Sequence, residues 1–384
     1  MSFWRALKKK FGKVSTVAPA AAVTGNIALP ARVANEAIER ILLLKLDHIG
    51  DLLVALRAME MLRTTWPKAE ITLLCGPWNV GFARTCGLVD HVVAFDFFAA
   101  SAAEAVDNDE LDHARVVALG LGTFDLAVDL RHDGDSRRVL DHVETRHRAG
   151  YHAHGLKHRL DLELPLVELY HGAAPPPLHA ETRLTLLAAA VVAAFDRPLI
   201  HPARRLIGAG GPRPFGDRPY AVFATGAGSP LRQWPADRLA ELIGRVIARF
   251  GFGVVLAGSP KECEMNAAIA ARLPGPDLID QTGAPLAEIP TTIAGAALFV
   301  GYDTGTTHLA AMLDVATVCI YGGISDPRVW QPVGRDITIV HAVVDCCYCH
   351  QSRPDACPND RVCMTSITVD DVFAAIAARL DLCH

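Results

Sequence analysis

The segment from Lys45 to Asp51 joins a hydrophobic run to a helical pattern and carries a carboxylate placed for chemistry. Gly50 lets the backbone turn tightly before the helix begins. Asp51 would then lie at the mouth of a cleft, beyond the carboxyl end of the strand. Aspartate is also a favoured helix N-cap, a role that stabilises a helix by about 0.5 to 2 kcal/mol. Spacing alone favours the capping role for Asp51.

A glycine-rich segment, Thr225 to Pro235, follows a second hydrophobic run. Its small residues, such as Gly228 and Ser229, let a phosphate group approach the backbone, and the guanidinium of Arg232 offers several donors to a diphosphate. Two glycines of a dinucleotide-binding fingerprint are present, but the third is missing. Glycine-rich turns are common, so the segment alone is a weak indication of a phosphate site.

The segment from Gly301 to Ala311 is more specific, because it combines a carboxylate, hydroxyls, a glycine and a histidine. Asp303, Thr304, Gly305 and His308 lie where a buried strand ends and a helix of small residues begins. The backbone amides and the partial positive charge of a helix N-terminus bind anions. As alternatives, Asp303 only caps the helix and His308 only packs beneath it. The combination favours a diphosphate or sugar site.

Two further patterns fall between Arg131 and Arg159. Asp133 and Asp135 would suit a divalent cation that bridges a nucleotide diphosphate, although short acidic pairs in turns are usually solvated. Cationic residues are dense there: Arg131, Arg137, Arg138, Arg146, Arg148, Lys157 and Arg159. They indicate either a surface for a phosphorylated or acidic acceptor or, as the default, a solvated basic face.

Cysteines are frequent, with 10 in the chain, and they crowd near the C-terminus. Cys346, Cys349, Cys357 and Cys363 offer four thiolates with a spacing compatible with a tetrahedral structural metal site. A local cross-link and reduced thiols are the alternatives, and a reducing compartment favours metal over a disulfide. Cysteines in apolar sequence are expected to be reduced core residues: Cys75, Cys86, Cys263 and Cys319.

The chain has 384 residues, of which 51% are hydrophobic, and this size predicts two domains. The net charge of -5 gives no overall field for nucleic acid. Short β-rich runs alternate with helical runs in both halves, as in parallel α/β sheets. The expected strands are Ile41–Leu46, Ile71–Cys75, Val92–Phe95, Phe124–Leu130, Tyr220–Ala224, Gly253–Ala257, Leu298–Gly301 and Thr317–Tyr321, and the expected helices are Asp51–Thr65, Ala236–Phe250, Glu262–Leu273 and Thr306–Leu313.

We therefore predict two doubly wound, Rossmann-like α/β domains that face each other across a cleft, with ligands beyond the carboxyl ends of the strands. The Pro-, Gly- and Arg-rich stretch from Arg197 to Pro219 marks the connection. The expected division is a leader at 1–37, an N-terminal domain at 38–205, and a C-terminal domain at 206–384 that carries the cysteine cluster 346–363.

The leader is basic and contains no acidic residue up to Asn35. Phe3, Leu7 and Phe11 would share one helical face, which indicates either contact with a membrane surface or a solvated, disordered leader. The apolar run Leu184–Phe195 is shorter than the ~20 residues that span a bilayer, so a buried helix is expected. These features predict a cytoplasmic protein, associated with the inner face of the inner membrane if the leader binds there.

Taken in order, the three loops resemble glycosyltransferase family 9, the lipopolysaccharide heptosyltransferase family. The resemblance runs from about Arg40 to Val372. The segments that carry it are Lys45...Gly50-Asp51, Arg232-x-Trp234-Pro235 and Asp303-Thr304-Gly305-x-x-His308-Leu309-Ala310. Each segment is weak alone, but three in the right order and spacing are strong.

The resemblance implies a fold of the GT-B type and an inverting, metal-independent transfer of a sugar, commonly heptose from ADP-heptose, to a hydroxyl of an envelope glycan or glycolipid such as lipopolysaccharide core. It implies that the domain at 38–205 holds the acceptor and the domain at 206–384 holds the nucleotide sugar. It also implies that Asp51 is the general base and that Arg232 faces the diphosphate. Relatives often have lysine in place of Arg232. Arginine keeps the positive charge but changes its geometry, so the identity of the donor sugar nucleotide is open. The implied substrate-binding residues are Gly50, Gly228, Ser229, Glu262, Asp303, Thr304, Gly305 and His308, with Glu262 near the nucleoside ribose.

No cofactor is implied for catalysis, but some protein-modifying members of the family bind iron through cysteines, so iron and zinc are both open for the cysteine cluster. Two other functions remain as alternatives: a sugar-nucleotide epimerase of the same build, and a non-catalytic protein that binds sugar nucleotides. A nicotinamide dehydrogenase is less favoured because the glycine fingerprint is incomplete.

Overall fold

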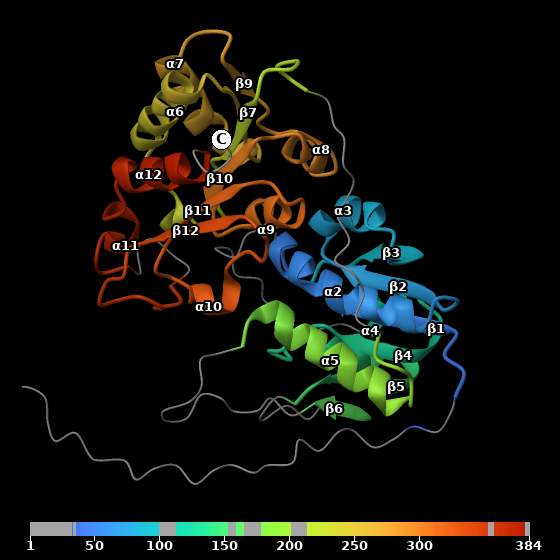
Figure 1. The fold of residues 1–384 in the computed structure, drawn as a ribbon. Coiled ribbons are helices and arrows are strands. Elements are labelled where there is room, and N and C mark those ends of the chain that lie inside the picture. The colour runs from blue at the N-terminus through green and yellow to red at the C-terminus, as the bar shows by residue number, and fades with distance from the viewer. Residues whose placement is uncertain are drawn as a thin grey trace, which may run out of the picture.

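The computed structural model describes residues 33, 36–99, 113–152, 159–164, 178–200, 213–351 and 357–380. Within these ranges the chain forms two six-stranded sheets, each flanked by helices (Figure 1). The strand orders are β3-β2-β1-β4-β5-β6 and β12-β11-β10-β7-β8-β9, and every strand pairing is parallel. The prediction of two doubly wound α/β units is confirmed.

The first sheet contains strands that are almost continuously apolar, as expected for parallel strands covered on both faces. In β1, five consecutive positions after Arg40 are buried. Its elements are β1 (Arg40–Lys45), α2 (Ile49–Thr65), β2 (Glu70–Cys75), η1 (Pro77–Asn79), α3 (Val80–Thr85), β3 (His91–Ala94), α4 (His113–Val117), β4 (Thr123–Asp129), η2 (Arg137–His142), β5 (Glu144–Tyr151), β6 (Leu162–Leu164) and α5 (Ala180–Ala194). The run expected to form a buried helix lies in α5 and the first residue after it.

The second sheet repeats this plan, with fully buried strands at its centre. Its elements are β7 (Tyr220–Ala224), η3 (Pro230–Arg232), α6 (Ala236–Phe250), β8 (Gly253–Ala257), η4 (Pro260–Glu262), α7 (Cys263–Arg272), β9 (Leu278–Asp280), α8 (Ile289–Ala294), β10 (Leu298–Tyr302), α9 (Gly305–Met312), β11 (Thr317–Tyr321), α10 (Pro327–Trp330), β12 (Ile337–His341), α11 (Val362–Thr365) and α12 (Val369–Leu380).

The two units touch where α2 meets α9 (Figure 1). The N-terminal ends of these helices are so close that a Cβ atom on Gly305 would lie 2.3 Å from Cγ2 of Ile49 and 3.1 Å from the backbone nitrogen of Gly50. One hydrophobic cluster includes buried residues of both units, with Leu52 on α2 and Leu309 on α9. The contact therefore fixes the loops that precede these two helices next to each other.

Two expectations lie outside the described residues, namely the basic leader and the central part of the connection between Arg197 and Pro219. Within the described ranges, no helix combines the length and the apolar composition needed to cross a bilayer.

Candidate active site

A cavity of about 410 Å³ lies between the two units, within the range typical of small-molecule sites. It brings together the three loops singled out in the sequence. Its lining includes, from the first unit, His48, Ile49, Gly50, Asp51 and Trp78, and from the second, Gly228, Arg232, Leu286, Asp303, Thr304, Gly305, His308, Ser325 and Trp330. Ser229 and Glu262 are not part of this lining.

Asp51 lies inside the first turn of α2 and does not cap it. The N-cap is His48, whose side chain makes no capping hydrogen bond, because its Nε2 lies 3.1 Å from the carbonyl oxygen of Ala99. The favoured capping role of Asp51 is therefore wrong. The carboxylate borders the cavity, next to Ile49 and Gly50. This position is compatible with a chemical role that capping would not have explained.

The pKa of Asp51 is raised, first by burial and then by the negative charge of Asp47. Lys45 and Arg131 oppose this shift without cancelling it. Asp47 behaves in the opposite way: burial disfavours its charge, but Lys45 and Arg131 hold its pKa below the usual value. Neighbouring carboxylates thus have pKa values pushed apart, an arrangement that often separates a structural carboxylate from a reactive one.

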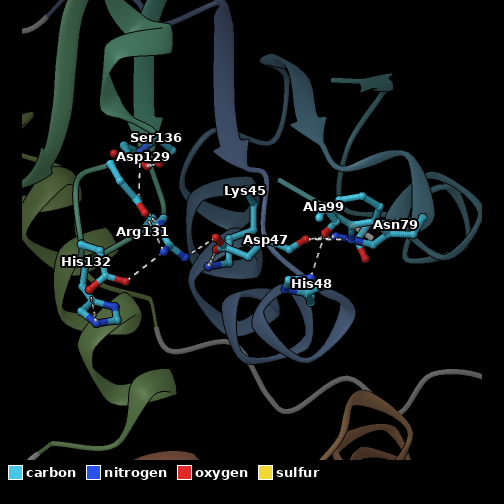
Figure 2. Close-up of polar contacts among 12 residues, drawn as sticks. Lys45, Asp47, His48, Asn79, Ala99, Asp129, Arg131, His132 and Ser136 are labelled. Carbon is cyan, nitrogen blue, oxygen red and sulfur yellow. Dashed lines mark hydrogen bonds and ion pairs between the residues drawn. The ribbon is translucent and has the colours of Figure 1, made fainter. Parts of the chain in front are cut away.

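Asp47 is the centre of an ion-pair network shown in Figure 2. The Lys45 ammonium and the Arg131 guanidinium both donate to its carboxylate. Its backbone carbonyl accepts hydrogen bonds from Asn79 Nδ2 at 2.8 Å and from Trp78 Nε1 at 3.0 Å. Asp47 is only 2% exposed, so these contacts fix the loop before α2.

Arg131 also occupies the acidic pair that was considered for a divalent cation. Its Nη2 lies 3.1 Å from a carboxylate oxygen of Asp133, and its guanidinium donates to Asp135. Both carboxylates already have a cationic partner. In the described chain, no group of three or more His, Cys, Asp or Glu side chains is placed to hold a metal ion.

The basic segment between Arg131 and Arg159 is largely paired within the protein. Arg137 is buried, and its Nε lies 3.4 Å from Oδ2 of the equally buried Asp129. Arg148 donates to backbone carbonyls at 3.2 and 3.0 Å. Arg159 pairs with Asp161 at 2.9 Å. The default of a solvated basic face is thus wrong for Arg137, and Lys157 lies outside the described residues.

On the second unit, Arg232 contacts Asp303 in the loop that precedes α9. Its Nη1 donates to the backbone oxygen of Asp303 at 3.1 Å and lies 3.5 Å from the Asp303 carboxylate. That carboxylate also accepts a 2.8 Å hydrogen bond from the Ser325 hydroxyl. Among the described residues, Arg232 Nε has no hydrogen-bond partner although it is buried. The guanidinium is therefore fixed in position beside the cavity.

The α9 loop presents mostly neutral groups. Thr304 is the N-cap of α9 and makes no side-chain capping bond, so the capping alternative for Asp303 is wrong. His308 is buried, and burial lowers its pKa to about 4 despite the nearby carboxylate of Asp303. Its imidazole is therefore neutral near pH 7. The amides at the start of α9 supply the partial positive charge of this loop.

Ser229 caps η3, and Glu262 completes the capping box of η4, whose N-cap is Ser259. The Ser229 side chain accepts a hydrogen bond from the backbone of Leu231 in η3 at 3.3 Å. Glu262 accepts from both the backbone and the hydroxyl of Ser259, at 2.8 and 2.6 Å. Its carboxylate lies against Gly226, where a Cβ would be 2.8 Å from Oε2. Both residues therefore stabilise the backbone at or next to the glycine-rich loop.

The predicted four-cysteine metal site is not formed among the described residues. Cys363 is buried, and its pKa is raised by burial and then by Cys346, Cys347 and Cys349. Cys347, which the spacing argument passed over, lies between this group and His341, with Sγ 3.8 Å from Nε2. No three or more of the predicted ligands are therefore placed to hold a metal ion in the described structure.

The isolated cysteines mostly follow expectation, since Cys75, Cys86 and Cys319 are buried. Cys263 is exposed, and its assignment to the core is wrong. It is the first residue of α7, and the buried residues of that helix are Asn266 and Ile269.

Solved structures share this architecture over most of their length. Escherichia coli ADP-heptose lps heptosyltransferase II superposes with a TM-score of 0.65 at 20% identity, covering 89% of this chain and 98% of that one. A family 9 glycosyl transferase from Veillonella parvula gives 0.70 at 16% identity, covering 91% and 99%. The iron-containing dodecameric glycosyltransferase TibC of E. coli gives 0.56 at 14% identity, covering 92% and 78%. The fold is that of a GT-B glycosyltransferase.

The sequence places the chain within this class. The model of glycosyltransferase family 9 (heptosyltransferase) matches residues 116–359. The chain belongs to this family and is a glycosyltransferase. Lipopolysaccharide heptosyltransferase 1 of Pseudomonas aeruginosa is 37% identical over 105 residues, which cover 27% of this chain and 29% of that protein. Membership favours sugar transfer over the epimerase and the non-catalytic alternative.

Proposed function

We propose that this enzyme is an inverting glycosyltransferase that moves a heptose from ADP-heptose to a hydroxyl of a bacterial envelope glycan, such as lipopolysaccharide core. The observation that carries the proposal is the shared cavity that Asp51 borders from one unit and Arg232 and the start of α9 border from the other. A transfer of this kind needs a base at the acceptor and positive charge at the leaving group, on opposite sides of the sugar.

In the proposed reaction, the acceptor hydroxyl gives its proton to the Asp51 carboxylate while its oxygen attacks the anomeric carbon. The bond between that carbon and the diphosphate oxygen breaks, and its electron pair leaves with ADP. Arg232 and the first amides of α9 stabilise the charge that develops there. One displacement inverts the anomeric centre, and no step requires a metal ion.

The donor assignment draws on relatives whose names include ADP-heptose or heptosyltransferase. We assign the diphosphate to Gly228, Arg232 and the segment Asp303–Gly305, with neutral His308 as a hydrogen-bonding partner. Glu262 and Ser229 would support the nucleoside side of the loop. The proposed division of labour places the acceptor on 38–205 and the donor on 206–384.

We also propose peripheral contact with the inner face of the inner membrane through the leader, because its Lys and Arg residues and its aromatic residues suit an anionic lipid surface. Co-sedimentation of the full chain with phosphatidylglycerol vesicles at low and high salt tests this contact. Salt-sensitive binding supports it, and equal recovery from phosphatidylcholine vesicles contradicts it.

Turnover of a donor panel tests the function. Purified enzyme is mixed with ADP-heptose, ADP-glucose or UDP-N-acetylglucosamine, with and without lipopolysaccharide extracted from a heptose-deficient strain. We expect release of ADP only when both ADP-heptose and this acceptor are present, with a product whose mass is increased by one heptose. Conversion of a nucleotide sugar without acceptor would identify an epimerase instead.

A further inference from the structure

A second, smaller cavity of about 100 Å³ adjoins the first on the side of the N-terminal unit. Lys45, Arg131, His132 and Arg183 contribute to its lining. Among the described residues, Asp51 and Trp330 are the two that line both cavities. The proposed base and one indole ring therefore mark the place where the two spaces meet.

Trp330 reaches this place from the second unit. It ends α10, a short helix whose N-cap Asp326 accepts a 2.9 Å hydrogen bond from the backbone of Arg328. Its ring centroid lies 6.5 Å from that of His132 on the first unit. The next residue, Gln331, places its carbonyl oxygen 2.8 Å from Nε2 of His179, the N-cap of α5. Helix α10 is thus docked on the first unit next to α5 (Figure 1).

The smaller cavity is not built for a strongly anionic group. Lys45 and Arg131 are both paired with Asp47, and Arg131 is paired with Asp133 and Asp135 as well. Its lining also includes apolar side chains of α2 and α5. A hydroxyl-bearing ring with an apolar face fits this mixture better than a phosphate, because the ring needs a flat apolar wall and a few polar partners.

We infer that the smaller cavity receives the ring of the acceptor sugar that carries the attacking hydroxyl, and that Trp330 is a positioning residue against which this ring packs. The inference rests on the proposed function. The indole holds the ring so that its hydroxyl points to Asp51, while the donor occupies the larger cavity. Because Trp330 belongs to the second unit, the acceptor site is complete only when the two units are in contact.

Substitution of Trp330 with leucine tests the inference, since leucine keeps apolar bulk but removes the flat ring. The acceptor probe is the lipopolysaccharide extracted from a heptose-deficient strain. We expect Trp330→Leu to raise the acceptor KM about tenfold or more, equivalent to about 1.4 kcal/mol, with a smaller change in donor affinity. Trp330→Phe should restore most of the acceptor affinity, which a purely structural role of this position would not require.

Leu286→Ala is the control, because Leu286 belongs to the second unit and lines the larger cavity but not the smaller one. It should weaken the donor more than the acceptor, the reverse of Trp330→Leu. An unchanged acceptor KM in a folded Trp330→Leu variant would overturn the inference.

Direct binding separates this inference from the proposed function. If the parent binds the acceptor but does not glycosylate it with ADP-heptose, the donor assignment has failed, and calorimetric binding of the acceptor to Trp330→Leu decides the inference alone. Tenfold weaker binding supports it and equal binding contradicts it. If the parent does not bind the acceptor, both the acceptor assignment and this inference are wrong.

Discussion

The loops that face each other across the cavity differ in how their charged groups are paired. The first unit concentrates ionised side chains, with Lys45, Asp47 and Arg131 paired below the surface. The second unit presents the guanidinium of Arg232 beside backbone amides and a histidine kept neutral by burial. A closed ion-pair network thus lies behind the first wall of the cavity, whereas the second wall offers positive character to a ligand.

This difference fits the two halves of the proposed transfer reaction. Paired charges on the first side leave one carboxylate, Asp51, with a raised pKa, and a base works best when its pKa is near the working pH. In the proposed reaction, the guanidinium and the oriented amides on the second side stabilise the anion that leaves with the product. The predictions below test the comparison, from the largest expected effect to the smallest.

Asp51→Asn should cause the largest loss, because asparagine keeps the shape of the side chain but cannot accept the proton. We expect the rate of transfer to fall by about 100- to 10,000-fold, the contribution of a positioned acid or base, with nearly unchanged donor affinity. Steady-state kinetics and donor titration measure both. Transfer at the parental rate would place the base elsewhere, with Asp47 as the next residue to test.

The same variant gives a stability control whose sign follows from the raised pKa. The ionised form of Asp51 is disfavoured in the fold, so its penalty appears as pH rises above the unfolded value of about 3.9 and is complete above the folded pKa. The asparagine side chain of the variant does not titrate. The Tm of Asp51→Asn should therefore equal or exceed that of the parent at pH 8, with the difference shrinking toward pH 4.

Arg232→Ala tests the opposite wall. Removal of one preorganised group that stabilises developing charge costs about 100- to 1000-fold in rate, so turnover should fall more than donor affinity. Arg232→Lys is the matched variant, since it keeps the charge but loses the contact geometry with Asp303. It should recover part of the rate. Unchanged turnover in Arg232→Ala would contradict the role.

The sequence predicted the scaffold well because buried parallel strands are apolar on both faces. It missed β5, with the sequence ETRHRAGY, since its polar residues hide the pattern. It also missed the short β6 and β9 strands and the terminal helix α12. These elements are fixed by pairing and packing with the rest of the sheet, which a local pattern does not encode.

The sequence predicted the main loops of the site but not the side-chain contacts that join these loops. Strand ends place Asp51, Arg232 and Asp303 at one cleft, and that follows from the topology of a parallel sheet. The pairing of Asp47 with Arg131 joins residues 84 positions apart, and the approach of Trp330 joins two units. Local spacing holds no information on such contacts, and for the cysteines it gave a ligand set that the structure does not assemble.

Gly305→Ala should have an intermediate effect by separating the two walls. The new Cβ would collide with Ile49 and press on the backbone of Gly50, and overpacking of this kind costs about 1 to 3 kcal/mol. We expect kcat/KM to fall about tenfold while the Tm changes little, because the contact can open at the cleft. Gly50→Ala is the control: its Cβ would meet Gly305 atoms at an ordinary 3.7 Å, so its loss should be smaller.

The smallest effect is a shift of the acidic limb of the pH profile, and its sign separates electrostatics from structure. As the proposed base, Asp51 must be ionised to act, so activity should fall as pH drops through its pKa. Asp47 raises this pKa and Arg131 lowers it. Asp47→Asn should therefore move the acidic limb to lower pH, and Arg131→Gln should move it to higher pH. Profiles of kcat/KM from about pH 4.5 to 8 measure both variants. If the two substitutions only loosened the loop, both variants would lose activity, but their acidic limbs would not move in opposite directions. Acidic limbs that shift in the same direction in both variants would show that the network acts on Asp51 through its position and not through its charge.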